Sequence, residues 1–157
     1  MESSKLLLNL FRAYYDARRN KRSTINSLAF EAEYEKNLFE LHEEIINRKY
    51  EIGESIAFIA DKPVKREIFT AKFRDRVVHH LLYNYLSPIF EPLFLPDSYA
   101  CRVNKGTHYG IKRLNHFIRS CSENYQKDCW ILKLDIKGYF MSIDRFILFQ
   151  KVEKCYI

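Results

Sequence analysis

The chain has 157 residues, enough for one domain or for a piece of a larger protein. Hydrophobic residues make up 47% of it and Gly and Pro number only four each, which excludes a low-complexity chain and provides for a packed core. The 26 Lys and Arg residues against 20 Asp and Glu give a net charge of +6, which is compatible with a polyanionic partner without requiring one.

The cellular compartment is predicted from three features that the sequence lacks. No apolar stretch approaches the length of a membrane span, and the N-terminus has no signal-peptide pattern. The four cysteines show no Cys-x-x-Cys spacing, which favours reduced thiols over a zinc site or a disulfide framework. We therefore expect a cytoplasmic protein with no membrane partner.

The first 49 residues predict two amphipathic helices. Apolar side chains recur at helical spacing over residues 5–19, and again from Ser23 or Thr24 to about Arg48, where glutamates fill the other faces. The acidic second helix is predicted to be scaffold. The basic end of the first helix either complements the helix dipole or contacts a phosphate backbone, and the two interpretations carry equal weight. Its residues are Arg18, Arg19, Lys21 and Arg22.

A β-hairpin is predicted next. Residues 50–59 are rich in β-branched and aromatic side chains, residues 61–65 contain Pro63 and read as a turn, and residues 66–70 form the return strand. The cations at the tip either deter edge-to-edge aggregation or contact a triphosphate. They are Lys62, Lys65 and Arg66.

The strongest helix is predicted from Phe73 to Ile89, with a charged first turn of Arg74, Asp75 and Arg76. The adjacent His79 and His80 point about 100° apart, so they cannot share a metal as an i, i+4 pair could. We interpret both as packing or hydrogen-bonding residues.

An irregular, proline-punctuated crossing leads to a helix from Tyr109 to about Cys121. Arg102 and Lys105 precede this helix, and a helix N-terminus flanked by cations favours an anion site. The order Lys-Gly-Thr is not that of a Walker A loop.

The segment from Trp130 to Ile136 is short and apolar apart from Lys133, and predicts a buried strand. An aspartate at such a strand end is more often a turn or cap residue than a catalytic one. Here Gly138 permits a sharp change of direction after Asp135, two aromatics follow, and Asp144 is placed to cap a helix over residues 145–152. Strand, terminal carboxylate, turn and aromatic pair are the parts that a metal-dependent nucleotidyl transferase needs.

Three stretches, in this order, resemble the conserved blocks of bacterial reverse transcriptases over about residues 50–150. The first comprises Lys62–Ile68 and Phe73–His80, the second Pro96–His108, and the third, polymerase motif A, Leu134–Phe140. The paired histidines and the sequence Ser-Tyr-Ala-Cys-Arg are most similar to those in the enzymes of diversity-generating retroelements. Group II intron and retron enzymes are near relatives.

The resemblance implies an α+β fold made of helix-rich fingers and part of the palm of a right-hand polymerase. Residues 1–49 would be an N-terminal helical segment, 50–129 the fingers, and 130–157 the start of the palm, with no thumb. The implied activity is RNA-directed DNA polymerisation by two-metal nucleotidyl transfer. Its partners would be an RNA template, a DNA or RNA primer, dNTPs, and Mg²⁺ or Mn²⁺.

Residue roles are implied position by position. Asp135 matches the motif-A carboxylate that binds the catalytic metals, with the Ile136 carbonyl as a second ligand. Phe140 matches the steric gate that rejects a ribose 2′-hydroxyl, and Arg66 matches the arginine that grips the triphosphate, assisted by Lys65. Four further cations would lie near template or nucleotide phosphates: Arg74, Arg76, Arg102 and Lys105.

One departure from the family's pattern matters most. The other palm carboxylates of the family lie in a Tyr-x-Asp-Asp sequence, which is absent here, and Asp144 is better explained as a helix cap. We therefore expect an N-terminal fragment that does not polymerise alone and that requires the missing palm and thumb. The alternatives are a non-catalytic module that grips RNA or an RNA/DNA hybrid, and a fragment that forms a homodimer through exposed core.

Overall fold

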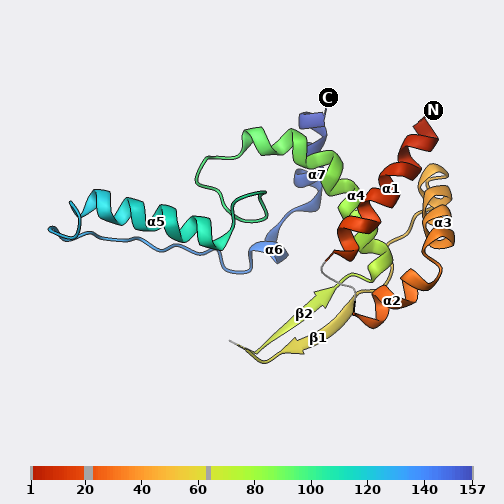
Figure 1. The fold of residues 1–157 in the computed structure, drawn as a ribbon, viewed down its shortest axis with the longest axis horizontal. Coiled ribbons are helices and arrows are strands. Elements are labelled where there is room, and N and C mark those ends of the chain that lie inside the picture. Colours follow the sequence, from red (N-terminus) through yellow and green to blue (C-terminus); the bar gives the residue numbers. More distant parts are fainter. Residues whose placement is uncertain (1, 20–22, 63–64, 157) are drawn as a thin grey trace. The chain divides into compact units, whose positions relative to one another are not determined.

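The computed structural model describes residues 2–19, 23–62 and 65–156, and the chain divides into two units, residues 1–87 and 88–157 (Figure 1). Helices dominate, and the described residues contain one two-stranded antiparallel sheet. This confirms the expected mixed, helix-rich α+β class. Across the described ranges, no helix is both long and apolar enough to cross a membrane.

The first unit contains five complete elements and most of a sixth. They are α1 (Glu2–Arg18), α2 (Ile25–Ala32), α3 (Tyr34–Ile46), β1 (Ile56–Ala60), β2 (Arg66–Thr70) and α4 (Phe73–Phe90), whose last turn enters the second unit.

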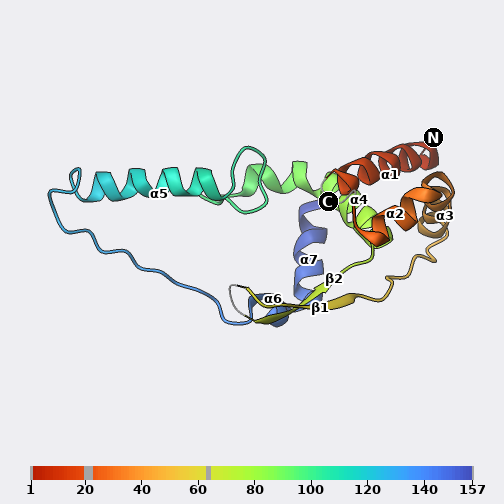
Figure 2. The ribbon, with the colours of Figure 1, turned by 60° about the horizontal axis from the view of Figure 1, so that its bottom comes forward.

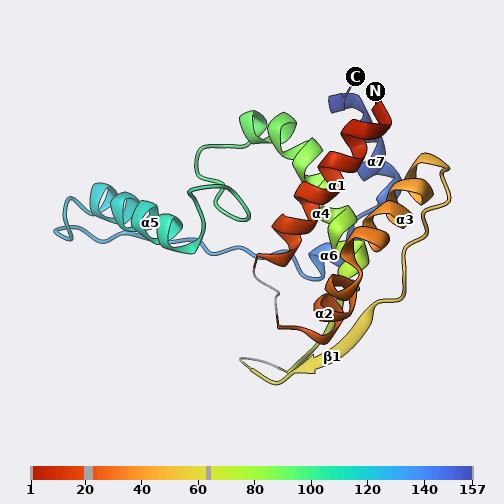
Figure 3. The same cartoon turned by 45° about the vertical axis from the view of Figure 1, so that its right-hand side comes forward.

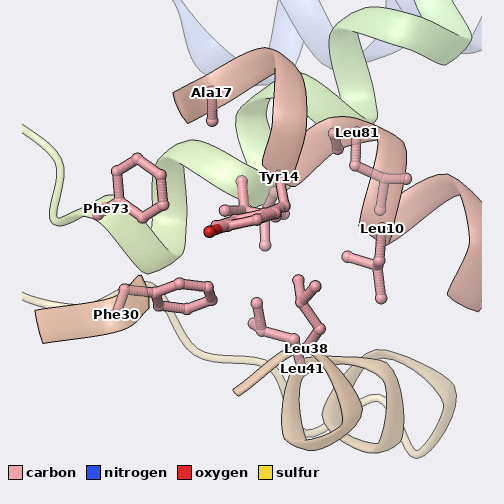
Figure 4. Packing of buried hydrophobic residues seen from close by; sticks show 11 residues of the cluster. Leu10, Tyr14, Ala17, Phe30, Leu38, Leu41, Phe73 and Leu81 are labelled. Carbon is pink, nitrogen blue, oxygen red and sulfur yellow. The ribbon is translucent and has the colours of Figure 1, made fainter. Parts of the chain in front are cut away.

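The core of the first unit lies between α1, α2, α3 and α4, as Figure 4 shows. Tyr14 is at its centre, stacked on Tyr34 with ring centroids 5.1 Å apart and meeting Phe73 edge-on at 6.1 Å. Such geometries suit the charge distribution of aromatic rings. The predicted apolar faces are only partly correct, because Tyr14, Leu38 and Leu41 are buried. Leu8, Tyr15, Ile25 and Leu28, which have the same helical spacing, are exposed. The buried set is Leu10, Ala13, Tyr14, Ala17, Phe30, Leu38, Leu41, Phe73, Val77, Val78 and Leu81.

The prediction of one continuous helix from residue 23 or 24 to 48 was wrong, because the chain breaks at Glu33 into α2 and α3. Glu33 leaves the helical region, with φ −130° and ψ 41°. The side-chain amide of Asn37 donates to the Phe30 carbonyl at 2.9 Å and so satisfies one backbone group that the break releases. The break lets Phe30 and Leu38 face the same core from two different helices.

The hairpin forms where it was expected, with the return strand at residues 66–70, although β1 begins only at Ile56. The register pairs Ile56 with Thr70 and Ala60 with Arg66. The turn residues 63 and 64, like Lys21 and Arg22 of the predicted basic helix end, lie outside the described residues.

In the second unit the last turn of α4 leads into a short 3-10 helix. The elements are η1 (Glu91–Leu93), α5 (Thr107–Cys121), α6 (Tyr139–Ser142) and α7 (Arg145–Tyr156). The prediction that Asp144 caps the last helix is confirmed, since its Oδ1 accepts the backbone N–H groups of Phe146 at 2.9 Å and Ile147 at 3.0 Å.

The predicted strand from Trp130 to Ile136 is absent, which makes that prediction wrong. The segment runs without regular structure between α5 and α6 (Figure 2), and its side chains are exposed, Trp130 by 94% and Leu134 by 81%. A strand needs a neighbour for its backbone hydrogen bonds, and the sheet of the described residues consists of β1 and β2 alone. An apolar run is therefore necessary for a buried strand but not sufficient.

Candidate functional site

Two of the predicted nucleotide-binding residues lie at the start of β2. Lys65 and Arg66 are exposed, and neither side chain has a hydrogen bond or ion pair with a described residue. Residues opposite each other or two apart on a hairpin share a face, so the register places Arg66 on the same face as Ile68 and Phe58. The hairpin thus presents free cations beside an apolar surface.

A cleft of about 460 Å³ lies along this hairpin face. Ile56, Phe58 and Ile68 of the hairpin contribute its apolar wall, and Thr24 and Asn26 at the start of α2 contribute polar groups. Arg76 of α4 also lines it. A pocket of this size with a mostly apolar lining and a few polar groups is of the kind that takes a small molecule.

Asp75, noted in the sequence only as part of a charged turn, is the buried anchor of this region. It is 1% exposed and accepts hydrogen bonds from the Tyr50 hydroxyl at 2.8 Å and the Gly53 N–H at 3.2 Å. Burial, together with the hydrogen bond to Asp75, raises the pKa of Tyr50. These contacts hold residues 50–53 against α4, which is why β1 begins later than predicted. The partners lie 22 and 25 residues before Asp75, so no local spacing signals them.

Arg74 and Arg76, predicted near phosphates, have internal partners. Arg74 pairs with Glu44 of α3, donates to the Glu51 carbonyl at 3.3 Å, and lies 5.1 Å from the centre of the Tyr50 ring. Arg76 donates to the Ala71 carbonyl at 3.1 Å and to the Thr70 hydroxyl. Both guanidinium groups join segments of the first unit, and their contact with nucleic acid stays a prediction.

Arg102 is the central contact of the crossing that precedes α5. Its side chain is 8% exposed and pairs with Glu91 at 2.7 Å. It also donates to the carbonyls of Leu95 at 2.8 Å and Ser98 at 3.1 Å. Lys105 donates to the Pro96 carbonyl at 2.5 Å. The two cations lie in one loop as expected, but each donates to backbone carbonyls of that same loop. A phosphate contact stays a prediction for both.

An ion pair that the sequence did not reveal ties the crossing to α5. Arg113 donates to both carboxylate oxygens of Asp97, at 2.8 and 3.2 Å, and the Tyr99 hydroxyl donates to the same group at 2.7 Å. The bonds from Arg113 and then Tyr99 lower the pKa of Asp97 to about 2.

Tyr99 also packs directly on Gly110 of α5. A Cβ atom at Gly110 would lie 2.9 Å from the Tyr99 ring. Any larger residue would therefore displace the ring or the helix.

Asp135 is exposed and unpaired within the described part of the chain. The neighbouring Ile136 carbonyl accepts the Tyr139 N–H at 3.3 Å. Gly138 adopts the left-handed conformation, with φ +64° and ψ 27°, and makes the predicted change of direction. Phe140 follows on α6 and is 84% exposed, with its ring 5.3 Å from that of Tyr139.

The predicted metal ligands offer one carboxylate and one backbone carbonyl on consecutive residues. Both are hard oxygen donors, and Mg²⁺ commonly takes one or two carboxylates together with substrate phosphates and water. Asp135 and Ile136 therefore fit one side of a magnesium site. Within residues 2–19, 23–62 and 65–156, no three His, Cys, Asp or Glu side chains gather as a ready metal site.

The candidate residues thus form separate groups. Lys65 and Arg66 lie in the first unit. Asp135, Ile136 and Phe140 lie in the second unit, within one stretch of six residues. His79 and His80 lie in the middle of α4, and neither side chain has a hydrogen bond or ion pair with a described residue.

Comparison with known proteins yields one weak similarity. No family model matches the chain. Over 81 residues, 52% of its length, the chain is 26% identical to Protein YkfC of Escherichia coli (strain K12). The matched region makes up 21% of YkfC, so the chain spans about a fifth of that relative's length.

Proposed function

We propose that this chain provides the fingers and the start of the palm of an RNA-directed DNA polymerase. The observation that carries the proposal is the occurrence of three reverse-transcriptase-like motifs in one order along the sequence. Two structural features agree with it: a β-hairpin with free cations at Lys65 and Arg66, and an exposed Asp135 followed by a glycine turn and an exposed Phe140.

Each group has a role in this proposal. Lys65 and Arg66 neutralise the triphosphate of the incoming nucleotide, and the hairpin positions it. The ring of Phe140 occupies the space that a ribose 2′-hydroxyl would need. The Asp135 carboxylate and the Ile136 carbonyl would contribute ligands to the two Mg²⁺ ions, which when bound would supply activation of the primer 3′-hydroxyl and stabilisation of the departing pyrophosphate.

The decisive test uses the product of the intact source gene. Sequencing beyond codon 157 should reveal an in-frame Tyr-x-Asp-Asp motif. The complete protein should then extend a DNA primer on an RNA template, and Asp135→Asn should lower the rate by a factor on the order of 10³ or more.

Asp128→Asn is the matched control for that test. Asp128 is also exposed and without a partner among the described residues, so its substitution should leave extension unchanged within about twofold. Equal activity in Asp135→Asn and the unsubstituted protein would refute the catalytic role.

A second candidate is a non-catalytic module that grips RNA or an RNA/DNA hybrid. It is favoured by the net charge of +6 and by the side chains of Lys65 and Arg66, which have no partner among the described residues. This candidate predicts that the 157-residue chain binds a hybrid duplex with an affinity that falls steeply with salt, but does not extend a primer. Extension by this chain that Asp135→Ala abolishes would exclude it.

A further inference from the structure

In the first unit α1 and α4 lie near one another (Figure 3). A cleft of about 540 Å³ opens between them and is lined by residues that carry polar groups. Its volume is that of a small-molecule site. None of its lining residues belongs to the motifs discussed above. The lining consists of Asn9, Arg12, Tyr15 and Asp16 of α1, and Asn84 and Tyr85 of α4.

The spacing of these residues gives α1 a second face. Asn9, Arg12 and Asp16 are three and four positions apart and so lie together on one side of the helix. The buried residues of α1, such as Leu10 and Tyr14, occupy the other side.

Two hydrogen bonds donated by side-chain amides join the two helices at the cleft. Asn9 donates through Nδ2 to the Tyr85 hydroxyl oxygen at 2.7 Å, and Asn84 donates through Nδ2 to Asp16 at 3.0 Å. These bonds fix the amides so that each side-chain carbonyl oxygen is left as an acceptor. The Tyr85 hydroxyl, which accepts from Asn9, still has its own proton to donate.

Arg12 is the cation of this cleft. It is exposed and forms no hydrogen bond or ion pair with a described residue. Asp16, one turn away, is instead bonded to Asn84 and lies 3.8 Å from Arg19. By contrast, Arg74 and Arg102 are fully engaged with carboxylates and carbonyls. The guanidinium of Arg12 is therefore available to an anion from outside.

We propose that this cleft binds one nucleotide unit. Arg12 takes the phosphate, because its planar guanidinium matches two phosphate oxygens. The half-exposed ring of Tyr15 takes the face of the base by stacking. The free amide oxygens accept from an exocyclic amino group while the Tyr85 hydroxyl donates to a ring nitrogen, which selects adenine or cytosine over uracil.

The test measures binding of fluorescently labelled single-stranded RNA, A8 and U8, to the 157-residue chain by anisotropy, and of AMP and UMP by calorimetry. A8 should bind more tightly than U8. Arg12→Gln and Tyr15→Leu should each weaken A8 binding by about fivefold or more. Arg12 is exposed and its side chain has no partner among the described residues, so its variant should keep the circular-dichroism spectrum of the unsubstituted chain. The Tyr15 ring also contacts Tyr14, with centroids 5.2 Å apart, so circular dichroism must show that Tyr15→Leu remains folded.

Lys49→Gln is the matched control, because Lys49 is an exposed cation of the same unit without a side-chain partner among the described residues. It should change A8 binding by less than about twofold. Equal losses in Arg12→Gln and Lys49→Gln, or no loss in Arg12→Gln, would overturn the proposal. Binding of AMP at the same site identifies a free nucleotide as the ligand source, whereas binding of A8 alone identifies a strand.

The cleft site does not depend on the proposed polymerase role. Lys65→Gln with Arg66→Gln should leave A8 binding at the cleft unchanged. The same double substitution should weaken dNTP binding if the hairpin has its proposed role. If the experiment contradicts the proposal for the cleft, the proposal for the hairpin is unaffected, and the reverse also holds.

Discussion

Arg74 and Arg102 look like surface cations in the sequence, yet both fold onto carboxylates and backbone carbonyls of their own unit. Arg12 and Arg66 have the same chemistry and no partner among the described residues. The difference arises from residues far along the chain, such as Glu44 for Arg74. The composition could therefore reveal an excess of cations but not which of them are free.

The contribution of the buried Asp75 hydrogen bonds to the free energy of unfolding can be measured directly. Asp75→Ala leaves the Tyr50 hydroxyl and the Gly53 N–H without their buried acceptor, so the free energy of unfolding should fall by about 2–4 kcal/mol. Tyr50→Phe removes one of these bonds and should cost about 1 kcal/mol. Urea denaturation followed by circular dichroism checks both values.

Asp61→Ala is the control for this series, since Asp61 is exposed and has no partner among the described residues. It should change the unfolding free energy by less than about 0.5 kcal/mol. Equal stability of the Asp75→Ala and Asp61→Ala variants would contradict the anchoring role.

The Asp97–Arg113 pair predicts a defined acid sensitivity. The pKa of Asp97 is about 2 in the folded chain against an ordinary value of 3.8, so its carboxylate stabilises the fold above pH 4. That contribution is lost as the pH falls from about 4 to 2. Arg113→Gln should move the pKa of Asp97 up towards its ordinary value, which NMR titration of the side-chain carboxyl carbon measures. A titration near pH 2 that persists in the variant would exclude Arg113 as the main cause.

At the scale of elements, the sequence predicted best where local chemistry decides. The return strand forms at residues 66–70, Asp144 begins a helix, and Gly138 makes a turn, and all three are as expected. The break at Glu33 and the unpaired segment 130–136 were missed. The first depends on two helices sharing one core, and the second on a neighbouring strand, neither of which local periodicity contains.

The cations of the hairpin are expected to bind the triphosphate of a nucleotide. Lys65→Gln with Arg66→Gln should weaken magnesium–dNTP binding about tenfold or more, because two cations that contact the triphosphate are lost. Stability should stay unchanged, since neither side chain has a partner among the described residues. Isothermal calorimetry measures the affinity. Lys36→Gln on α3 removes an exposed cation paired only with Glu33 and should have no effect; an equal loss there would indicate general charge attraction.

For the whole chain, the exposed apolar residues that follow α5 are the part most prone to self-association. Many large apolar side chains of residues 130–149 are exposed, and exposed apolar surface favours association. The backbone of residues 130–135 forms neither helix nor strand and has no hydrogen bond to a described residue, so its N–H and C=O groups can pair with another strand. The exposed set includes Trp130, Ile131, Leu132, Leu134, Ile136, Phe140, Met141, Phe146 and Phe149.

We therefore predict that the 157-residue chain self-associates, with an average sedimentation mass that rises with concentration. Leu132→Lys with Leu134→Lys should weaken association by at least about tenfold, because it places charge on the surface that would be buried. Gln126→Lys, in the exposed loop before this segment, should leave association unchanged. A monomer at every accessible concentration would contradict the prediction.

The contact between Tyr99 and Gly110 constrains how this gene can vary over evolutionary time. Every amino acid that can replace glycine brings a Cβ atom, which would lie 2.9 Å from the Tyr99 ring. A substitution at position 110 is tolerated only if position 99 becomes smaller or the ring moves, and moving it disturbs the bond to Asp97. Across homologous sequences, positions 99 and 110 should therefore covary, with a bulky ring at one found only where the other is glycine.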